Sequence, residues 1–161
     1  MDKKLIAIIV VIIAVVACVA VFASGFLSLG NEEVINETYN FNKFTLDLPQ
    51  NATMSNSSNT TLGVYFNTYI VSWTYKNGTS ESMNVTYVEG DNATNQQYVK
   101  LWTSLGAIDG GTYGDWVIII VPKNTTHNWY TLAKYDDGVR YELRGHNLGV
   151  LKKAADTFKK V

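Results

Sequence analysis

The sequence predicts an α+β fold, in which an N-terminal transmembrane helix is followed by a mostly antiparallel sheet with about two helices packed on it. Three observations support this prediction: an uncharged apolar run opens the chain, apolar residues alternate with polar ones over several later segments, and two segments have helical spacing. The length of 161 residues leaves room for one domain beside the helix. Apolar residues make up 47% of the chain and charged residues 17%, a composition that excludes a disordered protein.

Residues 1–30 are interpreted as a membrane anchor. Every residue from Leu5 to Phe22 is apolar, and a helix of this length rises about 27 Å, close to the ~30 Å hydrocarbon core of a bilayer. Two lysines precede the run, and three glutamates follow it before residue 38. By the positive-inside rule, the N-terminus is cytoplasmic, residues 5–29 contact membrane lipid, residues 31–37 are a tether, and residues 38–161 form an extracellular domain at the cell membrane.

Two alternatives for this segment stay open. A signal peptide cleaved after Val21-Phe22-Ala23 would be removed from the mature protein, although the apolar region is longer than the usual ~7–15 residues. Cys18 follows a stretch that is similar to a lipoprotein cleavage site, but the residues after it are apolar where a lipoprotein tether is polar. Cys18 is the only cysteine in the sequence, which excludes an intrachain disulfide.

The region after the anchor is rich in N-glycosylation sequons. The pattern Asn-x-Ser/Thr occurs eight times, whereas the 15 Asn and the 23 Ser or Thr among the last 131 residues would produce about three by chance. Such an excess is typical of a translocated surface whose exposed loops accept sugars, on a eukaryotic or archaeal cell. The candidate acceptors are Asn36, Asn51, Asn56, Asn59, Asn77, Asn84, Asn92 and Asn124.

Strands are predicted wherever apolar residues recur at every second position. This alternation over residues 69–75 and 82–87, with Asn77-Gly78 between them, predicts a hairpin. A three-residue loop that ends at Gly78 pairs Val71 with Met83 and keeps one apolar face, whereas a two-residue loop would not, so the longer loop is expected. Further strands are predicted at residues 39–48, 61–66, 115–121, 128–135 and 139–144.

Four segments bear on how these strands are arranged. Residues 115–121 are apolar on both faces, which predicts a central strand covered by a helix on one side. Residues 136–138, Asp-Asp-Gly, are expected to close a second hairpin whose register the sequence leaves open. Residues 50–61 are polar and are interpreted as an exposed loop. Residues 109–115 are interpreted as a helix-to-strand connection, because their spacing fits neither a calcium loop nor a phosphate loop.

Two helices are predicted from apolar spacing and capping residues. The first is capped by Asp91 or Asn92 and stops at Gly106. The second is capped by Asn147, and the lysines that follow, up to Lys160, favour the dipole at its C-terminal end. Their apolar faces consist of Tyr98, Leu101, Trp102 and Leu105 in the first helix and Leu148, Leu151, Ala155 and Phe158 in the second.

The order of strand, hairpin, helix, strand, hairpin and terminal helix, ending in NLGVLKKAADTFKKV, resembles the small α/β sandwich of the photosystem II extrinsic P-protein superfamily. The chain is also similar to uncharacterised, N-terminally anchored surface proteins of methanogenic archaea. The resemblance covers roughly residues 38–161 and rests on element order and on the terminal helix. It implies an assembly or binding module, and no catalytic residue carries over from it.

Few residues qualify for a site. The aromatic pair Trp129-Tyr130 and the neighbouring His127 form the candidate binding site. His127 and His146 are the only histidines, and neither has a second ligand at metal spacing, so no metal and no cofactor are predicted. The chain has no nucleophile elbow and no thiol outside the anchor, so no catalytic residue is assigned.

These observations favour a non-enzymatic function. The first interpretation is a single-pass membrane glycoprotein whose domain binds or scaffolds a protein partner of the cell envelope. The second is a binding module for a small ligand, such as a sugar or peptide. The third is an envelope hydrolase that uses His127 or His146 with one of Asp115, Asp136 and Asp137. The net charge of -1 offers no basic surface for nucleic acid.

Overall fold

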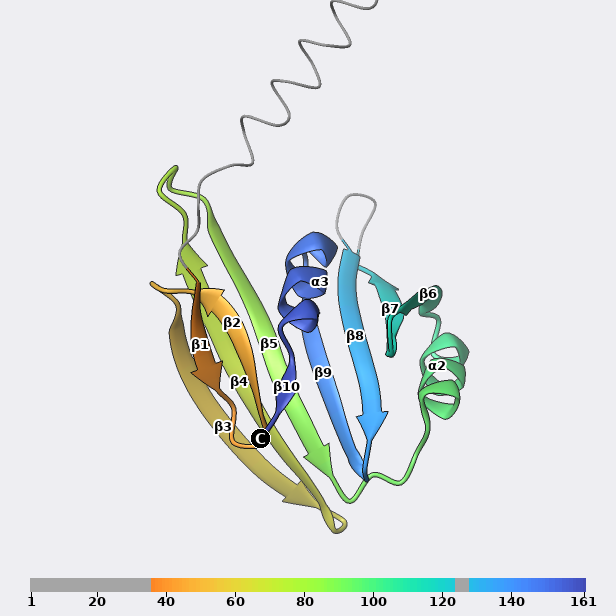
Figure 1. Ribbon diagram of the computed structural model, residues 1–161. Helices are drawn as coiled ribbons and strands as arrows, with labels where there is room; N and C mark the ends of the chain where they lie inside the picture. The colour runs from red at the N-terminus through yellow and green to blue at the C-terminus, as the bar shows by residue number, and fades with distance from the viewer. Residues whose placement is uncertain (1–35, 124–127) are drawn as a thin grey trace, which may run out of the picture. The chain divides into compact units, whose positions relative to one another are not determined.

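The computed structural model describes residues 36–123 and 128–161, which form two antiparallel sheets and two helices (Figure 1). The larger sheet has seven strands, in the order β3 (Thr53–Thr61), β4 (Val64–Thr74), β5 (Ser80–Glu89), β9 (Val139–Gly145), β8 (Asn128–Asp136), β7 (Trp116–Pro122) and β6 (Ile108–Tyr113). The smaller sheet has the order β1 (Asn36–Asn40), β2 (Phe44–Pro49) and β10 (Lys159–Lys160). The helices are α2 (Asn95–Ser104) and α3 (Leu148–Asp156).

The predicted α+β class is confirmed for this part of the chain. Both sheets are antiparallel throughout, and two helices accompany them within the described residues. The apolar run predicted to span the membrane lies outside the described residues. Among the helices that the structure does describe, none has the length and apolar character needed to cross a membrane.

One face of the large sheet holds the main core. The small sheet and α3 pack on this face, and Phe44, Leu46 and Leu48 of β2 are buried there. Because successive side chains of a strand point to opposite faces, the predicted alternation places one set of side chains from β4 and β5 on this core. That prediction is confirmed, since these residues are all buried: Tyr69, Val71, Trp73, Met83, Val85 and Tyr87.

The opposite face of the large sheet is covered by α2, which packs on β7 and β8. Tyr98 of α2 forms a second, smaller cluster with Val117 and Ile119 of β7 and Ala133 of β8. The first residues of β7 are buried on both faces of the sheet, as its continuous apolar run predicts, and a helix lies on one side. β7 pairs with β8 on one side and with β6 on the other, so it is an interior strand as predicted, although it is the second strand from one edge of the sheet.

Both predicted hairpins form, and the structure defines their registers. In the β4–β5 hairpin, Val71 pairs with Met83, and Gly78, with φ +83°, ends the three-residue loop as predicted. In the β8–β9 hairpin, the loop is Asp137-Gly138, a choice that the sequence left open. Both residues have positive φ, 55° and 74°, which is the geometry of a type I′ turn.

The interpretation of residues 50–61 as a loop is wrong. Most of this segment is β3, a nine-residue edge strand that pairs antiparallel with β4. All nine residues are exposed, so neither face selects apolar side chains, and the alternation that marks a strand in a sequence is missing. The strand predicted at residues 61–66 contains the turn at Leu62-Gly63 and only the first residues of β4.

The interpretation of residues 109–115 as a connection is also wrong. Most of the segment belongs to β6, an edge strand that pairs with β7 and carries an irregularity between Asp109 and Thr112. Gly110 is needed in this strand, because a Cβ atom there would lie 2.7 Å from the side chain of Ile118. Gly110 is therefore explained by the close approach of β6 to β7, although a glycine in a sequence is more typical of a loop.

The start of α2 differs from its prediction. Thr94, rather than Asp91 or Asn92, caps the helix, and it forms a reciprocal capping box with Gln97. The Asp91 carboxylate instead accepts a hydrogen bond from the backbone N–H of Ala93, which lies before the helix. Asp91 is thereby free to reach β9, where it contributes to the site described below.

The last residues of the chain close the core differently from the prediction. Asn147 caps α3 as expected, but the helix ends at Asp156. Phe158 therefore lies beyond the helix and packs against Phe44 and Tyr141. The two lysines that follow form β10 and extend the small sheet through β2. A turn at residues 41–43, beside β10, divides the predicted strand 39–48 into β1 and β2.

Candidate functional site

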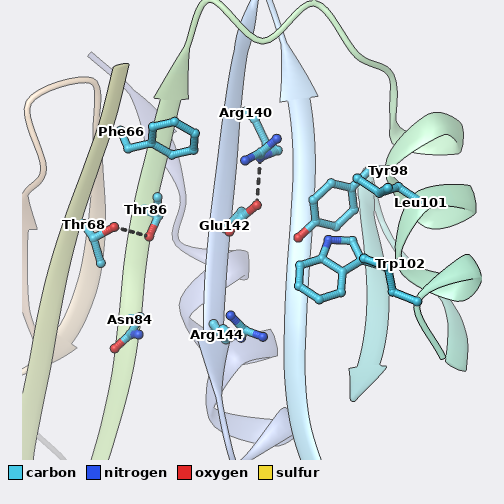
Figure 2. Close-up of a pocket in the computed structure, with 11 residues that line it drawn as sticks. Phe66, Thr68, Asn84, Thr86, Tyr98, Leu101, Trp102, Arg140, Glu142 and Arg144 are labelled. Atoms are coloured by element: carbon cyan, nitrogen blue, oxygen red, sulfur yellow. Dashed lines mark hydrogen bonds and ion pairs between the residues drawn. The ribbon is translucent and has the colours of Figure 1, made fainter. Parts of the chain in front are cut away.

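A cleft of about 340 Å³ lies between α2 and the uncovered part of the large sheet (Figure 2). Its floor consists of side chains from β4, β5 and β9, and its wall consists of side chains from α2. The cleft exists because α2 covers β7 and β8, while the neighbouring strands of the same face have no helix on them within the described residues. We therefore treat this cleft as the candidate functional site.

Strand register brings polar residues together on the floor. Thr68 of β4 lies opposite Thr86 of β5, and their Oγ1 atoms are 3.0 Å apart. Thr86 in turn lies opposite Glu142 of β9, so the three side chains form one row across the sheet. The next row pairs Asn84 with Arg144. Polar residues alternate with core residues here because one face of an antiparallel sheet can remain open to water.

Arg140 of β9 is the centre of a half-buried cluster of charges. Its Nε atom lies 2.7 Å from Oε1 of Glu142, and its Nη1 atom donates to the carboxylate of Asp91. Nη1 also donates to the hydroxyl of Tyr135 at 3.1 Å. Burial alone would lower the pKa of Arg140, but the charges of the two carboxylates and the bond to Tyr135 outweigh it, so the pKa is raised. Arg140 is thus held in place by ion pairs with Asp91 and Glu142.

Two tyrosines beside this cluster have raised pKa values. Tyr98 points from α2 toward the sheet, is 4% exposed, and its hydroxyl makes no hydrogen bond within the described residues (Figure 2). Burial first, and the charge of Glu142 second, raise the pKa of Tyr98 well above its usual value. Burial likewise raises the pKa of Tyr135 to about 12. Both side chains are therefore neutral at physiological pH.

Arg144 differs from Arg140 although the two are only four residues apart on the same strand. Its guanidinium lies over two indole rings, 5.5 Å from the Trp102 centroid and 5.9 Å from the Trp129 centroid. Within residues 36–123 and 128–161, no carboxylate lies within ion-pair distance of it. The Nε atoms of both arginines are buried without a well-aligned hydrogen bond in that part of the chain, but only the Nε atom of Arg140 has a carboxylate oxygen 2.7 Å away. Arg144 is thus a positioned cation that lacks a partner there.

The outer edge of α2 supplies apolar surface beside the cleft. The sequence predicted one apolar face for this helix, but the structure divides that face in two. Tyr98 and Trp102 are covered, whereas Leu101 is 57% exposed and Leu105 is 70% exposed. Ile70 of β4, which lies opposite Asn84 and so on the same face of the sheet, is 51% exposed.

The predicted binding residues reach this site only in part. Trp129 packs on His146, with 3.8 Å between the ring centroids, and contacts Arg144 beside the cleft. Tyr130 lies on the opposite face of β8 and packs against the main core. His127 lies outside the described residues. The structure therefore brings one member of the predicted trio to the cleft and separates another from it.

Sequence reasoning missed the charged floor of the cleft. A signal was present, because Arg140, Glu142 and Arg144 recur at every second position in a strand that was predicted. The alternation places all three on the face opposite the buried Tyr141 and Leu143. The sequence does not show that this face lies beside α2, since that depends on how the helix packs.

Of the histidines considered for a hydrolase, His146 has none of the three candidate aspartates as an ion-pair partner within the described residues, and His127 lies outside them. His146 is exposed, and its Nδ1 atom lies 3.1 Å from the carbonyl oxygen of Asn128. The three aspartates instead pair with lysines: Asp115 with Lys134, and Asp136 and Asp137 with Lys160. Within the described residues, no group of three or more His, Cys, Asp or Glu could hold a metal ion.

The sequons occupy two kinds of position. The exposed acceptors are Asn36, Asn51, Asn56, Asn59, Asn77 and Asn92. Asn84 is half-buried in the floor of the cleft, and Asn124 lies outside the described residues. Glycan occupancy remains a prediction at every one of these positions, but a glycan on Asn84 would fill the cleft.

Comparison with known proteins gives no match to this chain: no family model, no curated protein and no solved structure aligns with it. The resemblance to the photosystem II extrinsic P-protein superfamily and to anchored surface proteins of methanogens therefore stays a prediction.

Proposed function

We propose that the chain is a single-pass, membrane-anchored protein whose extracellular α+β domain is a non-enzymatic partner-binding module of the cell envelope. The anchor and its orientation rest on the apolar run, on the lysines before it and on the glutamates after it. The excess of sequons supports an extracellular domain independently of charge.

One observation carries the binding function: exposed apolar side chains gather around a charged cleft on the open face of the large sheet. Leu101 of α2, Leu105 directly after this helix and Ile70 of β4 are each more than half exposed there. Scattered apolar residues on a surface need no explanation, but a group beside a cleft with fixed polar residues is typical of an interaction site. The partner is expected to cover these side chains and to meet the charges of β9.

A small ligand is the second candidate for the same cleft. A volume of about 340 Å³ lies near the lower end of the range for ligand pockets, roughly 300–1,000 Å³, and would accept a sugar or a short peptide. A hydrolase that uses His146 is not proposed, because within the described residues His146 contacts a carbonyl oxygen and an indole ring rather than a carboxylate. His127, the other histidine considered, lies outside the described residues.

Photo-cross-linking in native membranes tests the proposal. A photoreactive amino acid replaces Leu101 in the full chain, and the matched control places it at Lys153, an exposed residue of α3 on the opposite face of the sheet. The expected result is a discrete protein adduct from position 101 that is missing from position 153. Equal labelling from both positions, or no adduct from an abundant and intact protein, would overturn the proposal.

A further inference from the structure

We propose that Arg144 is the anion-binding centre of the cleft and receives a carboxylate side chain from an acidic, partly apolar peptide segment of the partner. This inference deepens the proposed function and rests on it. Its basis is a difference in charge pairing between two arginines on one strand. Arg140 is held by Asp91 and Glu142, whereas Arg144 has no carboxylate within ion-pair distance in the described residues.

The surroundings of Arg144 leave it positive. Glu142, the nearest acid along the strand, is committed to Arg140 through a contact of 2.7 Å. Residues 124–127, Asn-Thr-Thr-His, which lie outside the described residues, include no acid. Lys123 adds a second cation next to the same indole, with its Nζ atom 5.7 Å from the Trp129 centroid. An incoming carboxylate is the complement of this charge.

The two tryptophans make Arg144 suitable for binding. A guanidinium packed against aromatic rings keeps its planar set of donors in one orientation, so less side-chain freedom is lost when an anion binds. Trp102 comes from α2 and Trp129 from β8, so both rings are fixed by elements that already pack on the sheet. An arginine held in this way presents parallel N–H groups that match the two oxygens of a carboxylate.

The side chain of Asn84 and the leucines at the rim of the cleft indicate which other groups the ligand carries beside its carboxylate. Asn84 lies directly opposite Arg144 on β5 and is half-buried, so its side chain can add a neutral hydrogen bond to the same anion. Leu101 and Leu105 stand at the rim with more than half of their surface exposed. An acidic sugar would leave these leucines uncovered, whereas a peptide with leucine or a similar residue next to its acid would cover them. We therefore assign the site to an acidic peptide segment.

A binding assay with the full chain in detergent micelles tests this assignment. The probe is a fluorescently labelled peptide of alternating glutamate and leucine, and the matched peptide has glutamine in place of glutamate. Fluorescence anisotropy is expected to show binding of the glutamate peptide and at least tenfold weaker binding of the glutamine peptide. Similar affinity for both peptides, or no binding of either, overturns the assignment.

Variants of the protein localise the effect to Arg144. Arg144→Gln is expected to weaken binding of the glutamate peptide at least tenfold. Arg144→Lys is expected to weaken it about threefold to tenfold, because lysine keeps the charge but loses the paired donors. Lys153→Gln removes the same charge on the opposite face and should leave the affinity unchanged. Thermal melting of each variant identifies misfolding, and Arg144→Lys keeps the test decisive if Arg144→Gln unfolds. Equal losses in Arg144→Gln and Lys153→Gln would contradict the inference.

Three further outcomes distinguish a failure of this inference from a failure of the proposed function. If polyglucuronate displaces the glutamate peptide at equal carboxylate concentration, the site takes acidic sugars and the peptide assignment is wrong. If position 101 captures a partner in membranes but Arg144→Gln does not reduce that capture, the binding module stands and the role of Arg144 is wrong. If position 101 captures nothing, the proposed function itself fails.

Discussion

The two faces of the seven-stranded sheet are built for different purposes. On one face, the small sheet and α3 cover the apolar side chains of β4, β5, β8 and β9 and form a single core. On the other face, α2 packs on β7 and β8, and the floor beside it carries threonines, an amide and three charges. The difference shows that apolar packing and exposed polar groups lie on opposite sides of the same strands, since each strand sends alternate residues to each face; binding at the polar face is the function we propose.

The same division separates two chemically identical side chains. Arg140 and Arg144 both lie on the open face of β9, but only Arg140 has carboxylates beside it within the described residues. We therefore expect Arg140 to stabilise the folded domain through its ion pairs, and Arg144 to contribute little to stability and to be available for binding. The predictions that follow test this division, beginning with the largest effect.

The largest difference between the two faces is expected in the free energy of unfolding when a side chain is removed from each. Leu46→Ala leaves a cavity between the small sheet and the large one, where Leu46 has no exposed surface. We expect a loss of about 2–5 kcal/mol in the free energy of unfolding. Leu101→Ala on the open face should change it by less than about 0.5 kcal/mol. Urea unfolding of both variants gives the comparison, and similar losses in the two would contradict it.

Replacement of the two arginines should have unequal effects on stability. Arg140→Met leaves Asp91 and Glu142 without their cation at positions that are only 20% and 17% exposed, which should cost about 2–3 kcal/mol. Arg144→Met leaves no carboxylate unpaired within the described residues, so we expect a cost of about 1 kcal/mol or less, from lost contact with the tryptophans. Chemical unfolding at neutral pH measures both values. An equal cost would show that Arg144 is as structural as Arg140.

Tyr98 should make the domain less stable in alkali. Its pKa is raised in the folded state, so above about pH 10 the unfolded chain loses the phenolic proton while the folded chain keeps it. Fewer protons on the unfolded state mean that stability falls as pH rises, by up to about 1.4 kcal/mol per pH unit for this residue. Tyr135, with its pKa raised to about 12, contributes in the same direction between pH 10 and 12.

The variant Tyr98→Phe isolates this contribution. At pH 7 it should be nearly neutral, because the lost hydroxyl makes no hydrogen bond within the described residues. At pH 11 it should be more stable than the wild type by about 1 kcal/mol. Guanidinium unfolding at the two pH values measures the difference. If the difference in unfolding free energy between Tyr98→Phe and the wild type does not grow with pH, the pKa of Tyr98 is not raised in the folded state.

The smallest expected effect concerns the sequons. Asn59 lies on the exposed edge strand β3, whereas Asn84 lies half-buried in the floor of the cleft. In a host that attaches N-glycans, Asn59→Gln should reduce the mass of the protein by one glycan, and Asn84→Gln should leave the glycan mass unchanged. Intact-protein mass spectrometry measures both. A glycan found on Asn84 would mean that the open face is covered by sugar and is not available to a partner.

The parts of the fold that could be predicted are those with one buried face. The β4–β5 hairpin was predicted to the register, because Val71 and Met83 must share the core side and Gly78 fits the left-handed position of the loop. The edge strands β3 and β6 could not be predicted in this way. All residues of β3 are exposed, and β6 is nearly as open, so neither strand has an apolar set for the sequence to display.

The candidate site was harder to predict than the fold, since it depends on contacts between distant segments. Trp129 was singled out as an aromatic beside a loop, and it does lie next to Arg144. Trp102 is predicted only as part of the apolar face of a helix, although its ring centroid also lies 5.5 Å from the Arg144 guanidinium. Tyr130, the neighbour of Trp129, points to the core because adjacent residues of a strand alternate between faces.

The most direct test of the central claim is partner capture from the open face with and without Arg144. A photoreactive residue at position 101 is combined in the full chain with Arg144→Gln or with Lys153→Gln, and adducts from native membranes are measured by quantitative mass spectrometry. The account predicts one dominant protein adduct that falls at least tenfold with Arg144→Gln and is unchanged with Lys153→Gln. An adduct that persists at full yield without Arg144, or the lack of any adduct at position 101, would contradict it.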